Sequence, residues 1–163
     1  MSHDGRGIAN FILDVCDELG RDVTNLSLQK LVFFCHAWYM VRTRKPLIKH
    51  QFEAWQFGPV LQYLYREFKP LDREPIRERC KKINLCTGKR EVVQIDLSPE
   101  ESQFLREVVS FYSKLSAGTL VELSHTEGGP WHNVWNHEGH VNPGMKISDA
   151  SILDFYSSVP IWS

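Results

Sequence analysis

The residues of this chain best suited to chemistry are histidines and glutamates near its C-terminal end. Four imidazoles and two carboxylates lie within 16 residues: His125, Glu127, His132, His137, Glu138 and His140. Both groups are zinc ligands, and three of them with a bound water would form a hydrolytic centre. Their spacing does not match the H-E-x-x-H helix, in which both histidines share one face. We therefore expect surface or packing histidines without metal or cofactor, and a zinc-dependent hydrolase is the alternative.

The cysteines offer a weaker case for catalysis. Cys35 and His36 are adjacent on an expected helix and point about a quarter-turn apart, so they are poorly placed to act as nucleophile and base. The four cysteines form no C-x-x-C pair, and the sequence contains no G-x-S-x-G motif, phosphate-binding glycine loop or kinase signature. We expect no catalytic residue, and hence a protein that is not an enzyme.

The composition is that of one globular domain spanning residues 1–163. Apolar residues make up 42% of the chain and aromatic residues 12%, which is enough for a core at this length. The formal net charge of −1 argues against a nucleic-acid binder, which usually carries a large positive excess. No apolar run is long enough to span a bilayer and no secretory signal is visible, so we expect a cytoplasmic protein.

The apolar spacing predicts a mainly α fold, a helical bundle around a central buried helix. This helix runs from about Thr24 to Arg42 and is apolar on nearly all sides, as expected for a helix packed on several faces. Other helices are predicted from Ile8 to Leu19, from Gly58-Pro59 to Pro70, from Pro99 to Leu115, around Leu120–His125, from Trp131 to Trp135 and from Ser148 to about Ser158. One or two short strands are predicted, within Pro46–Phe57 and Val92–Leu97.

Residues 70–91 are the least core-like part of the chain and are expected to form a basic loop within the domain. Seven basic and two acidic residues between Arg73 and Arg90 give this stretch a local charge of +5. It contains no aromatic residue, whereas proteins that bind single-stranded nucleic acid usually stack bases on aromatic rings. A solvated loop is the first interpretation, and contact with an acidic protein surface or with RNA are the alternatives.

Three ordered blocks of the sequence resemble the Panacea (SocA-like) antitoxin domain family. They are LSLQKLVFFCHAWYMVRTRKPLI (residues 26–48), FEAWQFGPVLQYLYREFK (residues 52–69) and LVELSHTEGGPWHNVW (residues 120–135). The step from Glu53-Ala54-Trp55 to Gly58-Pro59-Val60 is the most specific piece. Together with the first helix, the blocks span nearly the whole chain.

The resemblance implies an antitoxin of a bacterial or phage toxin–antitoxin pair, which neutralises its cognate toxin by direct protein–protein binding. It also implies alternatives. One branch of the family, the SocA type, acts as an adaptor that delivers its partner to the ClpXP protease, and other members lie in prophages or mobile elements, where a regulatory role is the expectation. The expected partner is therefore a toxin protein, with no membrane and no direct nucleic-acid partner.

The residues proposed for partner binding come from the three blocks. They are Gln29, Lys30, Phe33, His36, Trp55, Phe57, Gly58, Pro59, His125, Pro130 and Trp131. Trp55 and Phe57 could anchor an interface, or they could simply close the core at a turn. Gln29 could contact the partner, or it could satisfy buried backbone groups. The sequence does not separate these alternatives.

Overall fold

The computed structural model describes residues 2–136 and 144–162 and has the predicted mainly α architecture. The helices are α1 (Gly5–Glu18), α2 (Asn25–Thr43), α3 (Gln62–Phe68), the short 3-10 helix η1 (Lys69–Leu71), α4 (Pro99–Tyr112), α5 (Ala117–Ser124), α6 (Pro130–Trp135) and α7 (Asp149–Ser157). The strands are β1 (Phe52–Trp55), β2 (Gly58–Val60), β3 (Lys81–Ile83), β4 (Arg90–Val92) and β5 (Met145–Ile147). The described residues thus contain more short strands than the one or two that were predicted.

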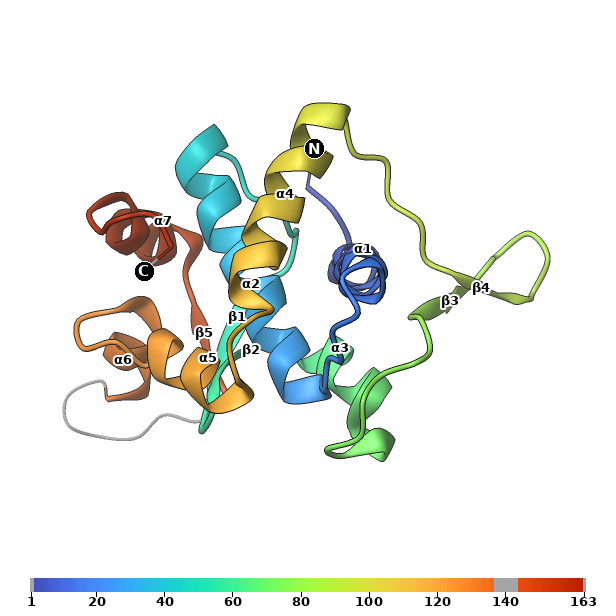
Figure 1. The fold of residues 1–163 in the computed structure, drawn as a ribbon, viewed down its shortest axis with the longest axis horizontal. Coiled ribbons are helices and arrows are strands. Elements are labelled where there is room, and N and C mark those ends of the chain that lie inside the picture. Colours follow the sequence, from blue (N-terminus) through green and yellow to red (C-terminus); the bar gives the residue numbers. More distant parts are fainter. Residues whose placement is uncertain (1, 137–143, 163) are drawn as a thin grey trace.

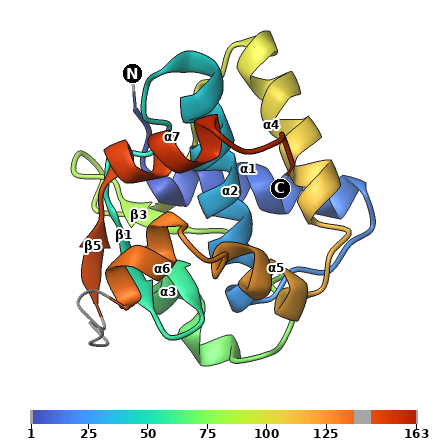
Figure 2. The ribbon, with the colours of Figure 1, turned by 90° about the vertical axis from the view of Figure 1, so that its left-hand side faces the viewer.

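Helix α2 is the centre of the fold, as predicted. Every residue from Leu28 to Met40 is buried, because α1, α4, α5 and α7 all pack against this helix (Figures 1 and 2). The helix begins where the side chain of Thr24 accepts a hydrogen bond from the Ser27 N–H, and it ends at Arg44 in the left-handed conformation. A helix that is apolar all round requires neighbours on all sides, and this arrangement supplies them.

Aromatic rings join α2 to α4 and α7. Phe34 stacks on Tyr112 of α4 with 4.2 Å between ring centroids, and the Trp38 Nε1–H donates to the Tyr112 hydroxyl over 2.6 Å. Tyr156 of α7 packs edge-on against the rings of Phe33 and Trp38. The core therefore depends on ring geometry as well as on the burial of apolar area.

A three-stranded antiparallel sheet, in the order β2-β1-β5, covers one side of the bundle. Trp55 pairs with Gly58 around a two-residue turn, and Phe52 pairs with Ile147 at the far end of the chain. The prediction that Gly58-Pro59 opens a helix is wrong. Gly58 has a φ of +112°, which is not helical, and Pro59 lies on an edge strand, where its missing N–H is tolerated. Helix α3 begins at Gln62.

The predicted starts of the helices at Pro99 and at Ser148 are confirmed. Ser98 and Glu101 form a complete capping box at the start of α4, and Ser148 caps α7. Gly20 adopts a φ of +69° just after α1, as expected of a residue that ends a helix. In the described part of the chain, no helix is long and apolar enough to cross a membrane.

The basic stretch predicted as a loop contains a small hairpin. Strands β3 and β4 pair antiparallel, with Ile83 opposite Arg90, and they extend away from the helices (Figure 1). The strand expected over Val92–Leu97 lies slightly earlier, at Arg90–Val92. Met145–Ile147 forms a further short strand, which pairs with β1.

Candidate partner-binding site

The three sequence blocks meet around a buried lysine. Lys30 of α2 is fully buried, and its Nζ donates a hydrogen bond to the Pro59 carbonyl oxygen over 2.9 Å. Burial lowers the pKa of Lys30 to about 7, because an ammonium group loses its hydration inside the protein. In this structure the amine has no exposed surface, so its role is to hold the β1–β2 hairpin against α2.

Gly58 allows the close approach of three elements at this point. A Cβ atom at this position would lie 2.5 Å from Lys30 Cε and 2.6 Å from Ser124 Oγ. The positive φ of Gly58 is also unfavourable for residues with a side chain. Only glycine therefore lets β2 sit directly between α2 and α5.

Trp131 also binds the same hairpin. Its ring stacks on His125 with 3.6 Å between centroids and 8° between planes, and its Nε1–H donates to the Trp55 carbonyl oxygen over 2.7 Å. Pro130 is buried at the first position of α6, where its missing N–H leaves no intrahelical hydrogen bond unmade. The C-terminal block thus holds β1, while Lys30 holds β2.

His125 is held in an environment that disfavours its charged form. Burial lowers its pKa, and the positive charges of Lys30 and His132 lower it further. Among the described residues, its Nε2 is a buried atom without a hydrogen-bond partner. A neutral imidazole stacked on an indole is consistent with a packing role rather than proton transfer.

Gln29 satisfies backbone and side-chain groups within the core. Its Oε1 accepts from the Leu61 N–H over 3.2 Å, and its Nε2 donates to Asn25 Oδ1 over 3.1 Å. The side chain is fully buried, so the alternative in which it satisfies buried groups describes this conformation.

Phe33 and His36 lie in the core and make contacts of their own, separate from those of Lys30. Phe33 packs edge-on against Phe52, and His36 Nδ1 accepts from the Ile48 N–H over 3.2 Å. His36 Nε2 lies 2.9 Å from Asp149 Oδ1, and since Nδ1 is an acceptor, Nε2 carries the proton. Both side chains are fully buried, so the expectation that they touch a partner directly does not fit this conformation.

The structure brings together most of the residues proposed for partner binding but leaves few of them exposed to solvent. One cluster, which we call the Lys30 cluster, consists of Lys30, Trp55, Gly58, Pro59, His125, Pro130 and Trp131. The exposed member of the set is Phe57, with 55% of its surface accessible at the tip of the β1–β2 turn, beside the half-buried Trp55. The cluster therefore positions a hairpin tip that carries an aromatic side chain.

The histidine-rich segment can be followed only in part. His132 Nδ1 accepts a long hydrogen bond from the Gly128 N–H at 3.4 Å, while His137, Glu138 and His140 lie outside the described residues. Within the described ranges, no group of three or more histidine, cysteine or acidic side chains could hold a metal ion.

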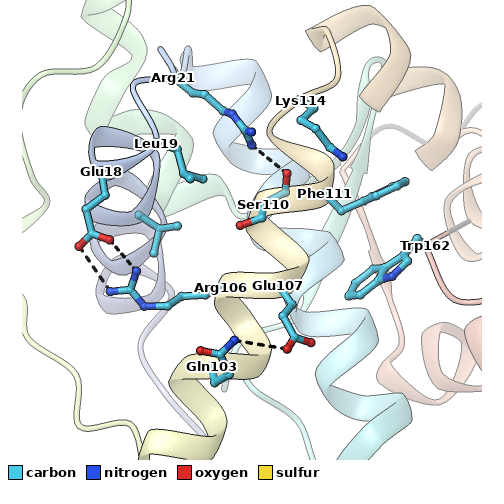
Figure 3. Close-up of a pocket in the computed structure, with 11 residues that line it drawn as sticks. Glu18, Leu19, Arg21, Gln103, Arg106, Glu107, Ser110, Phe111, Lys114 and Trp162 are labelled. Atoms are coloured by element: carbon cyan, nitrogen blue, oxygen red, sulfur yellow. Dashed lines mark hydrogen bonds and ion pairs between the residues drawn. The ribbon is translucent and has the colours of Figure 1, made fainter.

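A groove of about 590 Å³ between α1 and α4 is a second surface feature, not anticipated from the sequence (Figure 3). Leu19, Phe111 and Trp162 contribute apolar surface, with the Phe111 and Trp162 rings stacked at 5.7 Å. Arg106 Nη1 binds Glu18 Oε2 at 2.6 Å and lowers the pKa of Glu18, while Arg21 donates to the Ser110 carbonyl oxygen. The lining carries charges of both signs, from Glu18, Glu107, Arg21, Arg106 and Lys114, so the groove has no clear charge preference.

The sequence-based reasoning also missed the exposed apolar side chains of the β3–β4 hairpin, Ile83 and Leu85. A signal for this hairpin was present. The short runs Lys81–Ile83 and Arg90–Val92 flank turn residues Asn84 and Gly88, and Gly88 has a φ of +71°.

Comparison with known proteins agrees with the arrangement of the three blocks. Residues 28–132 match the family described as "Antitoxin SocA-like, Panacea domain". The chain is similar to a protein named "Antitoxin SocA" from Caulobacter vibrioides (strain NA1000 / CB15N), with 36% identity over 158 residues that cover 94% of this chain and 82% of the relative. No solved structure matches the chain. The chain belongs to the SocA-like antitoxin family that is defined by the Panacea domain.

Proposed function

We propose that this chain is an antitoxin that neutralises a toxin protein by binding it directly. The observation that carries the proposal is the match of residues 28–132 to the SocA-like antitoxin family, together with 36% identity to a named antitoxin over most of both chains. We place this activity in the cytoplasm and assign it to binding without catalysis. Within the Lys30 cluster, the Lys30 amine and the Trp131 indole N–H both bond the hairpin backbone, which supports a positioning and binding role.

We further propose Phe57 and the half-buried Trp55 as one contact with the toxin. Phe57 is more than half exposed although it is a large apolar residue, and the hairpin that carries it is held by Lys30 and Trp131. Aromatic anchors on rigid elements are common among residues that dominate binding energy. The buried members of the cluster then act as positioning residues for this tip.

Co-expression tests the proposal. The product of the gene beside the one for this chain is induced in bacteria alone and together with this chain, and colony formation is counted. We expect growth to stop in the first case and to recover in the second, because a bound toxin is masked. If no neighbouring gene product is toxic alone and harmless with this chain, the antitoxin proposal is wrong.

The same cells distinguish neutralisation from delivery to a protease. With simple masking, the toxin stays abundant on an immunoblot while growth recovers. An adaptor of the kind implied by the resemblance would instead lower the toxin level in cells that contain ClpXP and not in cells that lack it. Phe57→Ala is expected to reduce rescue, whereas Ile161→Ala, a similarly exposed apolar residue elsewhere, should not.

A further inference from the structure

The β3–β4 hairpin with its turn, residues 81–92, is the most exposed element of the described structure, and we refer to it as the arm. All six strand residues are exposed, and in Figure 1 the arm extends away from the helices. In the ranges that the structure describes, β3 and β4 pair only with each other, so each has an unpaired outer edge. An unpaired edge presents N–H and C=O groups to which another strand can add.

The arm carries apolar side chains that its own fold does not cover. Leu85 at the turn is 96% exposed and Ile83 is 60% exposed. Together with Val92 they border a shallow hollow of about 380 Å³ on the arm itself. A hairpin of two strands is marginal alone in water, so apolar groups gathered on it gain most when a second surface covers them.

The charge of the arm indicates the chemistry of that surface. Four basic residues and a single acidic one, Glu91, lie between Lys81 and Val92. Arg90 approaches Glu67 only at 3.8 Å, and Lys81, Lys82 and Lys89 form no ion pair with another described residue. A complementary surface is therefore acidic, with an apolar pocket for the side chains at the tip.

The base of the arm is fixed, in contrast to its exposed outer part. The buried side chain of Asn10 in α1 donates to the carbonyl oxygens of Cys80 and Val93, each over 3.0 Å, and accepts from the Cys80 N–H over 2.7 Å. Arg79 pairs with Asp14 at 2.8 Å and also with Asp17. An element held in this way loses less conformational entropy when a partner binds it.

We propose that the arm is a second contact with the toxin, inserting Leu85 and Ile83 into an apolar pocket that acidic residues surround. This inference rests on the proposed antitoxin function. A protein fits better than RNA, because no aromatic residue between Pro70 and Gln103 provides a surface for base stacking. The exposed strand edges and apolar tip suit a polypeptide.

The test uses the full chain and the purified product of the neighbouring gene, with affinity measured by calorimetry from 50 to 300 mM NaCl. Leu85→Ala is expected to weaken binding at least tenfold. The double change Lys82→Glu with Lys89→Glu should weaken it at least tenfold at low salt and flatten the salt dependence. The matched controls are Leu19→Ala and Lys114→Glu at the α1–α4 groove, which should change affinity less than twofold. Circular dichroism checks that each variant is folded.

Cys86 provides an independent measurement. It is the exposed cysteine, while Cys16, Cys35 and Cys80 are buried, so a maleimide dye will label the turn of the arm selectively. Addition of the toxin should shift the emission of this dye to shorter wavelength. An unchanged spectrum under conditions in which calorimetry shows binding would overturn the proposal.

The outcomes separate this inference from the function on which it rests. If the unchanged chain neither binds nor neutralises the product of the neighbouring gene, both the antitoxin function and the role of the arm are wrong. If it does both and the arm variants do so equally well, the arm is not a contact and the antitoxin function stands. If only Leu19→Ala and Lys114→Glu weaken binding, the interface lies at the groove between α1 and α4. Arm-dependent binding of a single-stranded RNA oligonucleotide, or arm-dependent dimerisation of the chain alone in light scattering, would replace the toxin as the partner of the arm.

Discussion

Gly58 shows how a single residue type can be imposed by neighbours distant in the sequence. Its backbone lies between Lys30 and Ser124, and its φ of +112° belongs to a region that glycine adopts easily. Local sequence gives no sign of this constraint, since Gly-Pro is also a common helix start. The constraint becomes visible only when the elements are packed together.

We expect Gly58→Ala to destabilise the protein by at least about 2 kcal/mol, through backbone strain and a Cβ contact at 2.5 Å with Lys30. Urea unfolding monitored by circular dichroism measures the change. Gly118→Ala is the matched control, because the nearest atom to its added Cβ is 4.0 Å away and alanine favours a helix. Equal effects of the two substitutions would contradict the packing described for Gly58.

Lys30 predicts a pH dependence of stability. Its pKa is about 7 in the folded protein, against about 10.4 in an unfolded chain. Between these values the unfolded chain binds more protons, so the free energy of unfolding should rise with pH by roughly 1 kcal/mol per unit. Below pH 7 both states are protonated, and the penalty of the buried charge is present in full.

Denaturant unfolding from pH 6 to 9.5 measures this dependence, with Lys30→Met as the reference. Other groups titrate in the same range, so the informative quantity is the difference in the free energy of unfolding between the unchanged protein and the Lys30→Met variant. It should be constant below about pH 6.5 and should change in favour of the lysine protein as the pH rises. A difference that does not vary with pH would show that Lys30 titrates normally.

At the scale of single elements, the arm depends on its attachment to α1. Asn10 makes three hydrogen bonds to the backbone of Cys80 and Val93, and their loss would leave buried polar groups without partners. We expect Asn10→Ala to cost about 2 kcal/mol and to speed amide exchange at Cys80 and Val93 at least tenfold.

Hydrogen exchange followed by mass spectrometry or NMR measures this effect. Asn84→Ala is the control, since Asn84 Oδ1 accepts from the Cys86 N–H within the exposed turn. It should affect the turn and leave the exchange of Cys80 unchanged. If both substitutions gave the same exchange pattern, Asn10 would not be what attaches the arm.

Elements whose signals are local were predictable, and those that depend on distant partners were not. The central helix and the Ser98 capping box follow from apolar spacing and from side chains within one turn. Strand β2 was taken for a helix because Lys30 and Ser124, which place it, are far from it in sequence. For the site, the family blocks contain residues that the fold brings together, but the sequence did not show that Phe57 is exposed while Gln29, Phe33 and His36 are buried, because burial depends on the packing of distant elements.

At the scale of the whole molecule, aromatic contacts join α7, which is distant in sequence, to the central helix α2. Tyr156 packs against the rings of Phe33, Phe34 and Trp38 and is 3% exposed. We expect Tyr156→Ala to lower the free energy of unfolding by about 3–5 kcal/mol, as for other large aromatic residues removed from a core.

Thermal and urea unfolding of the whole chain measure this loss. Leu85→Ala is the control within the same chain, since a side chain that is 96% exposed should change stability by less than about 0.5 kcal/mol. A small effect at Tyr156 would show that α7 does not take part in the cooperative core.

The pairing of β1 with β5 has a consequence for synthesis on the ribosome. Glu53 of β1 and Lys146 of β5 are 93 residues apart, and their side chains meet at 3.1 Å. At about 5–20 residues per second, translation needs on the order of 5–20 s to cover that interval. A nascent chain that already contains Phe57 therefore cannot complete the β2-β1-β5 sheet until β5 has been synthesised. A cell that must restrain a toxin quickly thus depends on antitoxin molecules that are already complete.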